Sequence, residues 1–316
     1  MKETLKGYLY TIFAAIAWGF SGICGEILLK SHQVDAGWLT SVRMLIAGVC
    51  LLAYVWIKPN IRIINLALVS KKGNWLTLFA FAVFGLFMLQ YPFIMAIQHS
   101  NAGTATMLQY LGPGLIVFYM CAKDKRLPHI IEVVALVFTL IGTAVMATDG
   151  QFSNLSLSPA TLFWGLASAL GILLYTVIPM RLIAKYNATV VITYGFLIGG
   201  LITGIGFQIW EKSVGYDLNL ILLVVLMSVV GTVLAFAIYL EGVAIIGPIR
   251  ASMIACLEPV SAVFFSVIFL GHRFRPMELI GMVLLLLGVT MISLKDMQLP
   301  ILPILSKRAL PLQEED

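Results

Sequence analysis

Long apolar runs separated by short polar breaks fill almost the whole chain. A helix needs about 20 apolar residues to cross the hydrocarbon core of a bilayer, and most of the runs reach or approach that length. They predict ten membrane-spanning helices, at residues 7–29, 37–57, 75–97, 103–121, 130–148, 159–180, 189–209, 219–241, 249–270 and 276–294. The tail at 295–316 carries three prolines and ends in three acidic residues, so we expect it to be disordered.

The first run follows Lys2 and Lys6, as in a secretory signal peptide. However, it is longer than the 7–15 apolar residues of such a peptide, and no small-residue cleavage pattern follows it. Its second half also contains Glu26. We therefore interpret it as the first transmembrane helix.

The second half of the chain repeats the first at an offset of 146 residues. Trp18 and Gly19 match Trp164 and Gly165, and ten of the 38 positions from 105 to 142 are identical to those from 251 to 288 without a gap. Other matched pairs are Gly25 with Gly171, Gly85 with Gly231, Pro113 with Pro259, and Glu132 with Glu278. Each repeat (7–148 and 159–294) holds five predicted helices. Because five is odd, the second repeat enters from the opposite side, and two inverted repeats are typical of secondary transporters that work by alternating access.

The basic residues predict the orientation. If the helices cross alternately from an internal N-terminus, fifteen Lys and Arg residues fall in internal segments and four in external ones. We therefore expect both termini to be cytoplasmic, in the plasma membrane of a bacterial-type cell. This placement at helix ends also accounts for the net charge of +5, so nucleic-acid binding is not expected.

Composition excludes several other classes of protein. The chain is 60% hydrophobic and 11% charged, against about 25% charged residues in soluble domains. Its cysteines lie in apolar runs without paired spacing, so neither disulfides nor a metal site are expected: Cys24, Cys50, Cys121 and Cys256. No phosphate-binding loop is present and the histidines are solitary, so we expect no cofactor, no ATP-driven pump and no intramembrane enzyme.

Four stretches resemble the drug/metabolite transporter superfamily, specifically its EamA-type transporters with ten helices: AIAWGFSGI (15–23), RMLIAG (43–48), YPFIMAIQHSNAGTATMLQYLGP (91–113) and YLEGVAIIGPIRASMIACLEPV (239–260). The resemblance implies an exporter or exchanger of small metabolites, with amino acids and related compounds among the substrates. The alternatives are a passive channel or an uptake carrier for another small solute. The family's leucine-glycine-glutamate signature is altered in both halves, and His272 stands where the second acid is expected.

Two prolines mark a candidate binding site. Pro113 and Pro259 lack an N–H, so the carbonyls of Gln109 and Ala255 lose their helical partners in the membrane. Helices broken at equivalent places in both repeats indicate a substrate site, although a packing kink has the same sequence pattern. The neighbouring Gln109 and Tyr110 favour a site in the first repeat, because they offer polar groups beside the open backbone.

Charged and aromatic residues inside the helices give the other candidates. Glu258 adjoins Pro259 and is either a proton-coupling group or a structural partner. Arg43 is either a snorkelling anchor or a binder of a substrate carboxylate. Trp18 and Trp164 are candidates for stacking on a substrate or for filling equivalent gaps between helices. Gln90 and Tyr91 are candidates for lining a cavity formed mainly by the first, third, fourth, sixth, eighth and ninth helices.

Overall fold

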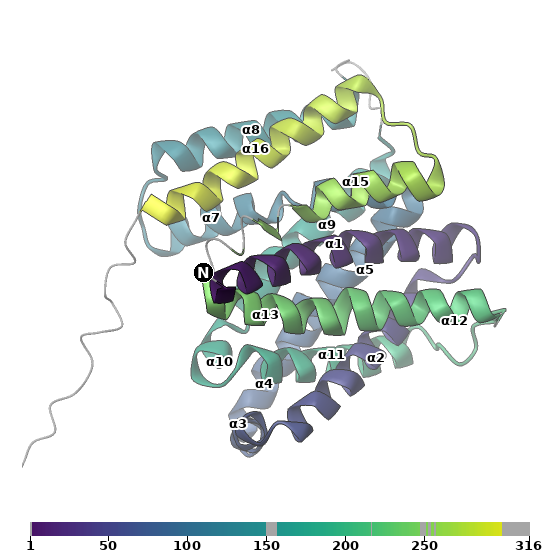
Figure 1. Cartoon of the computed structure of the whole chain (residues 1–316), viewed down its shortest axis with the longest axis vertical. Coiled ribbons are helices and arrows are strands. Elements are labelled where there is room, and N and C mark those ends of the chain that lie inside the picture. Colours follow the sequence, from purple (N-terminus) through teal and green to yellow (C-terminus); the bar gives the residue numbers. More distant parts are fainter. Residues whose placement is uncertain are drawn as a thin grey trace, which may run out of the picture.

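A computed structural model describes residues 2–149, 157–215, 217–246, 251, 254–255 and 257–298, and these are mostly helical (Figure 1). The first repeat contains α1 (Lys2–Lys30), α2 (Ala36–Ile57), α3 (Pro59–Val69), α4 (Lys72–Ala80), the π-helix η1 (Phe81–Phe87), α5 (Met88–His99), α6 (Ala102–Gln109), α7 (Gly112–Lys123) and α8 (Ile130–Thr148). The second contains α9 (Pro159–Val177), α10 (Met180–Lys185), α11 (Ala188–Gly206), α12 (Leu218–Val225), the π-helix η2 (Leu226–Leu234), α13 (Ala235–Ile246), α15 (Leu257–Leu270) and α16 (Pro276–Gln298).

The predicted spans correspond to these helices with modest shifts at their ends. Seven helices of the described residues are long and apolar enough to cross a membrane, and four shorter ones are also apolar. The third predicted span is continuous from α4 through η1 to α5, whereas the fourth is divided between α6 and α7. The sixth ends at Val177, before Pro179, and α10 follows it. The start of the ninth span and the tail from 299 onward lie outside the described residues.

Equivalent helices of the two repeats have equivalent neighbours in the packing. α1 packs against η2, α13 and α15, while its equivalent α9 packs against η1, α5, α6 and α7. α2 packs against its own equivalent α11, and α8 lies along its equivalent α16 (Figure 1). Exchanging the two repeats therefore leaves this set of contacts nearly unchanged, as a pseudo-two-fold relation requires.

The two π-helices also lie at matching places, because adding 146 to the bounds of η1 gives 227–233, inside η2. Neither was predicted. Each contains a matched glycine that lets another helix approach closely: a Cβ at Gly85 would lie 3.3 Å from the Cα of Tyr175, and one at Gly231 would lie 2.3 Å from the Cβ of Ser21. Small residues of this kind allow close helix packing in membranes.

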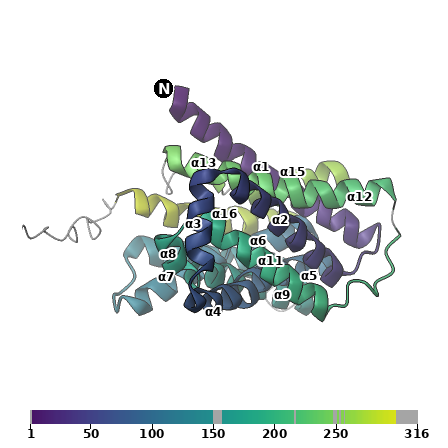
Figure 2. The same cartoon turned by 90° about the horizontal axis from the view of Figure 1, so that it is seen from below.

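At the far end, where α1 stops at Lys30, side chains cap the starts of the helices that run back through the bundle. The capping oxygens of Asp35, Asn101, Ser158 and Asp217 accept hydrogen bonds from backbone N–H groups two or three residues into α2, α6, α9 and α12. At the N-terminal end, where α1 begins, the short α3 lies across the direction of its neighbours (Figures 1 and 2).

Candidate functional site

A cavity of about 300 Å³ lies between the two repeats. Its walls come from α1, α2, α5, α6, α9, α11, α13 and α15, so α2 and α11 contribute in addition to the helices that we expected. Five of the candidate residues line it: Trp18, Arg43, Gln90, Gln109 and Glu258. α8 and α16 pack against each other and contribute nothing to the lining. The volume is at the low end for small-molecule sites, which suits a small solute.

A hydrogen bond holds one side of the Arg43 guanidinium group. The residue is 7% exposed, and its Nε donates a 3.0 Å hydrogen bond to Oγ1 of Thr232. Thr232 lies in η2, and its hydroxyl donates in turn to the carbonyl of Met227. Among the described residues, the two terminal nitrogens of Arg43 form no hydrogen bond. Their N–H groups are therefore available to a ligand in the cavity, beside a π-helix, an element that is often found at functional sites.

Tyr110 connects the interruption between α6 and α7 with the segment around Pro259. Its hydroxyl lies 2.8 Å from the carbonyl oxygen of Ala255, which Pro259 deprives of a helical partner, and 3.1 Å from Oε2 of Glu258. Tyr110 itself lies in the interruption between α6 and α7, close to Pro113. A phenol has a single proton to donate, so both contacts are good hydrogen bonds only when Glu258 is protonated and donates to the phenol oxygen.

Glu258 and Arg43 line the same cavity without forming an ion pair. Their charged groups do not come within 4.0 Å of each other. No described residue forms a hydrogen bond to Oε1 of Glu258. The cavity therefore presents a cationic group and a carboxyl group that both have free bonding positions.

Amide and aromatic side chains form the rest of the lining. The side chains of Gln90 and Gln109 have no hydrogen-bond partner among the described residues, although both are largely buried. Trp18 packs against Phe236 at 5.4 Å and Tyr239 at 5.0 Å between ring centroids, and its buried indole N–H has no described partner. The site thus combines apolar walls with several unused polar groups.

Two candidates lie away from the cavity. Trp164 and Tyr91 pack against each other with ring centroids 5.7 Å apart, and Tyr91 also stacks on Phe87 and Phe207. Neither lines the cavity, because their rings fill gaps between helices. Pro113 shapes the break between α6 and α7 but is not part of the lining.

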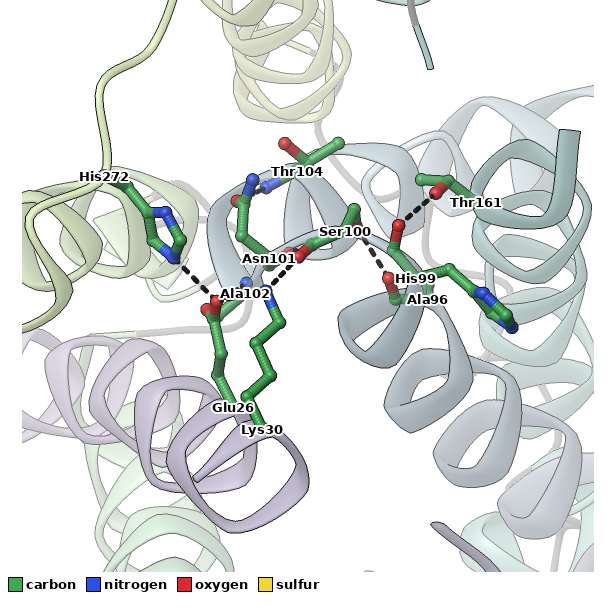
Figure 3. A network of polar contacts seen from close by, with 10 residues as sticks. All are labelled: Glu26, Lys30, Ala96, His99, Ser100, Asn101, Ala102, Thr104, Thr161 and His272. Carbon is green, nitrogen blue, oxygen red and sulfur yellow. Dashed lines mark hydrogen bonds and ion pairs between the residues drawn. The ribbon is translucent and has the colours of Figure 1, made fainter. Parts of the chain in front are cut away.

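A polar cluster built on Glu26 lies at the far end of the bundle (Figure 3). Glu26 is 1% exposed; its Oε1 lies 2.8 Å from Nζ of Lys30 and 2.7 Å from Nε2 of His272. Its Oε2 accepts a 2.7 Å hydrogen bond from the backbone N–H of Ala102, the first residue of α6. Lys30 also donates to the carbonyl of Ser100. The cluster therefore ties together α1, the start of α6 and the connection between α15 and α16.

This cluster lies beyond the cavity along α1. Ser21 lines the cavity and Glu26 follows five residues later, which is about 8 Å along a helix. No partner for Glu26 or His272 was identified from the sequence. The i, i+4 spacing of Glu26 and Lys30 was the available signal for an ion pair, but nothing local connects either residue with His272.

Comparison with known proteins agrees with this arrangement. The sequence model of the EamA-like transporter family matches residues 5–148 and 159–294. The chain belongs to the EamA-like transporter family. The resemblance seen in the sequence and the all-helical plan of ten spans in two repeats are thereby confirmed, and this EamA-like chain is a multi-pass membrane protein of a transporter family.

Individual relatives cover nearly the whole chain. The uncharacterized inner membrane transporter YicL of Salmonella typhimurium is 35% identical over 294 residues, which are 93% of this chain and 97% of that protein. The uncharacterized transporter YwfM of Bacillus subtilis is 23% identical over 300 residues, 92% of this chain and 95% of that protein. A solved crystal structure with 17% identity matches with a TM-score of 0.63, covering 93% of this chain and 99% of its own, and so supports the fold.

Proposed function

We propose that the protein is a secondary carrier of the inner membrane that exports or exchanges zwitterionic solutes of the amino-acid class. The observation that carries this proposal is the pair of unneutralised groups, Arg43 and Glu258, in one cavity. A free amino acid has a carboxylate that pairs with the terminal nitrogens of Arg43 and an ammonium group that pairs with Glu258. The amides of Gln90 and Gln109 supply further hydrogen bonds, and the aromatic walls accept an apolar side chain.

Glu258 is in our proposal also the proton-coupling group. The phenol of Tyr110 has one proton for two nearby oxygens, and this geometry supports a Glu258 that is protonated before substrate binds. A substrate ammonium beside Glu258 favours the ionised carboxylate instead. Binding of substrate and release of a proton are then linked at Glu258. A proton gradient drives transport because the protonated and the ionised forms of Glu258 differ in their affinity for substrate.

The Glu26 cluster is in our proposal the closed outer gate of an alternating-access cycle. The asymmetry of the basic residues supports cytoplasmic termini, which places the far end and its cluster outside. The cavity extends from Ser21 toward residues near the N-terminal end of the bundle, such as Tyr239 and Ile192. This conformation is then one in which the outer side is closed.

Counterflow in proteoliposomes tests the carrier mechanism. Vesicles loaded with an unlabelled amino acid should accumulate the labelled compound transiently, and the exchange should saturate. A passive channel would give leakage without accumulation. That result would favour the alternative of a facilitator and contradict alternating access.

A matched set of ligands tests the substrate class. We expect phenylalanine or leucine to raise the melting temperature of the purified protein more than the corresponding amine or the corresponding deaminated acid, because each analogue leaves one charged group unpaired. Arg43→Gln should abolish this preference for the carboxylate. If the amine stabilised the protein as well as the amino acid, Arg43 would be a structural anchor and the proposed substrate class would be wrong.

A further inference from the structure

A second hollow of about 300 Å³ lies at the N-terminal end of the bundle, apart from the central cavity. It is bordered by Ile63, Ile64 and Ala67 of α3, by Lys71 just before α4, and by Lys185 and Tyr186 at the end of α10. The first four residues belong to one repeat and the last two to the other. The proposed function makes no use of this hollow.

The helix beside the hollow has the features of an interfacial helix. α3 lies across the direction of the neighbouring helices, in both views of the molecule (Figures 1 and 2). Its Asn65 and Leu68 are buried against the protein, whereas Ile63 and Leu66 are largely exposed. Helices with an open apolar face and basic residues beside it lie in the plane of the membrane surface.

The charge in the hollow is uncompensated. Lys71 and Lys185 are both exposed, and neither forms an ion pair within the described part of the chain. The ammonium group of Lys185 lies 5.5 Å from the ring centre of Tyr186, whose hydroxyl accepts a 3.0 Å hydrogen bond from Asn74. Two cationic groups thus border the aliphatic side chains of α3, beside a tyrosine whose hydroxyl is fixed by Asn74.

We propose that this hollow binds an anionic phospholipid, with the lipid phosphate between Lys71 and Lys185 and an acyl chain along Ile63, Ile64 and Ala67. The phosphate complements the two ammonium groups, and basic pockets at this depth recognise anionic head groups. The aliphatic wall selects a lipid over a soluble anion, because a soluble phosphate would leave that wall in water. The lipid would also join the two repeats, since the lysines come one from each.

Lipid binding to the purified protein tests this site. Native mass spectrometry in a neutral detergent should show one phosphatidylglycerol bound with a clear preference over phosphatidylcholine. The double variant Lys71→Gln/Lys185→Gln should bind phosphatidylglycerol roughly 25-fold more weakly, at about five-fold per lysine. Lys71→Arg/Lys185→Arg should keep most of the affinity, because it keeps both charges.

The matched control is Lys58→Gln/Arg62→Gln, which removes two charges at the start of α3 but outside the hollow. In detergent the control variant should change the affinity for phosphatidylglycerol less than about two-fold, because no membrane surface is present to give long-range attraction. An equal loss in the control would show general electrostatic attraction and overturn the site. Equal binding of phosphatidylcholine, or displacement of the lipid by millimolar inorganic phosphate, would also overturn it.

Discussion

Replacing Tyr110 by phenylalanine tests whether its hydroxyl links the interruption between α6 and α7 to the segment around Pro259. The substitution keeps the ring in its place and deletes the hydroxyl that contacts the carbonyl of Ala255 and the carboxyl of Glu258. Because residue 259 is a proline, no backbone N–H can take over at Ala255. The change therefore leaves one backbone acceptor in the membrane interior without its partner.

The size of the effect follows from these two contacts. An unsatisfied buried acceptor costs about 1–3 kcal/mol, and the weaker 3.1 Å contact to Glu258 adds no more than about 1 kcal/mol. We therefore expect Tyr110→Phe to destabilise this conformation by about 1–4 kcal/mol. At about 2–4 °C per kcal/mol in a large chain, the melting temperature should fall by several degrees.

The assay is thermal unfolding in detergent together with amino-acid binding. Tyr91→Phe is the matched control, because the Tyr91 ring is stacked between aromatic neighbours and its hydroxyl has no described hydrogen bond. We expect little change in melting temperature for the control and weaker ligand binding for Tyr110→Phe alone. Equal melting temperatures for the two variants would refute the idea that the Tyr110 hydroxyl links its own segment to Ala255 and Glu258.

Four further results are expected. Glu258→Gln should abolish the dependence of transport on a pH gradient while exchange remains measurable, and unchanged proton-driven transport would make Glu258 structural. Glu26→Gln should weaken the far-end cluster and let an external thiol reagent reach a cysteine placed at Ser21; unchanged labelling would contradict the gate. Pro113→Ala should restore the helical bond to Gln109 and weaken substrate binding with normal expression, whereas a packing kink predicts lower abundance and unchanged affinity. A reporter at residue 154 should be accessible only from outside, and cytoplasmic labelling would reverse the topology.

The spans could be predicted from the sequence because the bilayer requires long, uniformly apolar helices. α3 was missed for the same reason: it is too short to span, and its apolar residues are mixed with polar ones such as Asn60, Arg62 and Asn65. The π-helices were missed because the residues of η1 and η2 are as apolar as those of an ordinary span. A single wider turn does not change the hydrophobic pattern that a sequence window detects.

The cavity lining could be predicted only in part, because one sequence does not show which way each helix face points. Gln90 and Tyr91 are neighbours, yet they stand about 100° apart around the helix, and only Gln90 lines the cavity. Trp18 and Trp164 match in the repeat, but only Trp18 reaches the cavity. The contact between Glu26 and His272 joins residues 246 positions apart, which no local rule connects.

The two repeats share features of their packing but differ in polar residues of the cavity. The matched Gly85 and Gly231 allow another helix to approach closely at both π-helices. The polar residues of the cavity do not match, since Glu258 corresponds to Gly112 and Gln109 to Ala255. Two symmetric halves can exchange conformations at little cost, but a symmetric cavity would present like charges to both ends of a substrate. An asymmetric solute such as an amino acid therefore requires the positions at which the two repeats differ.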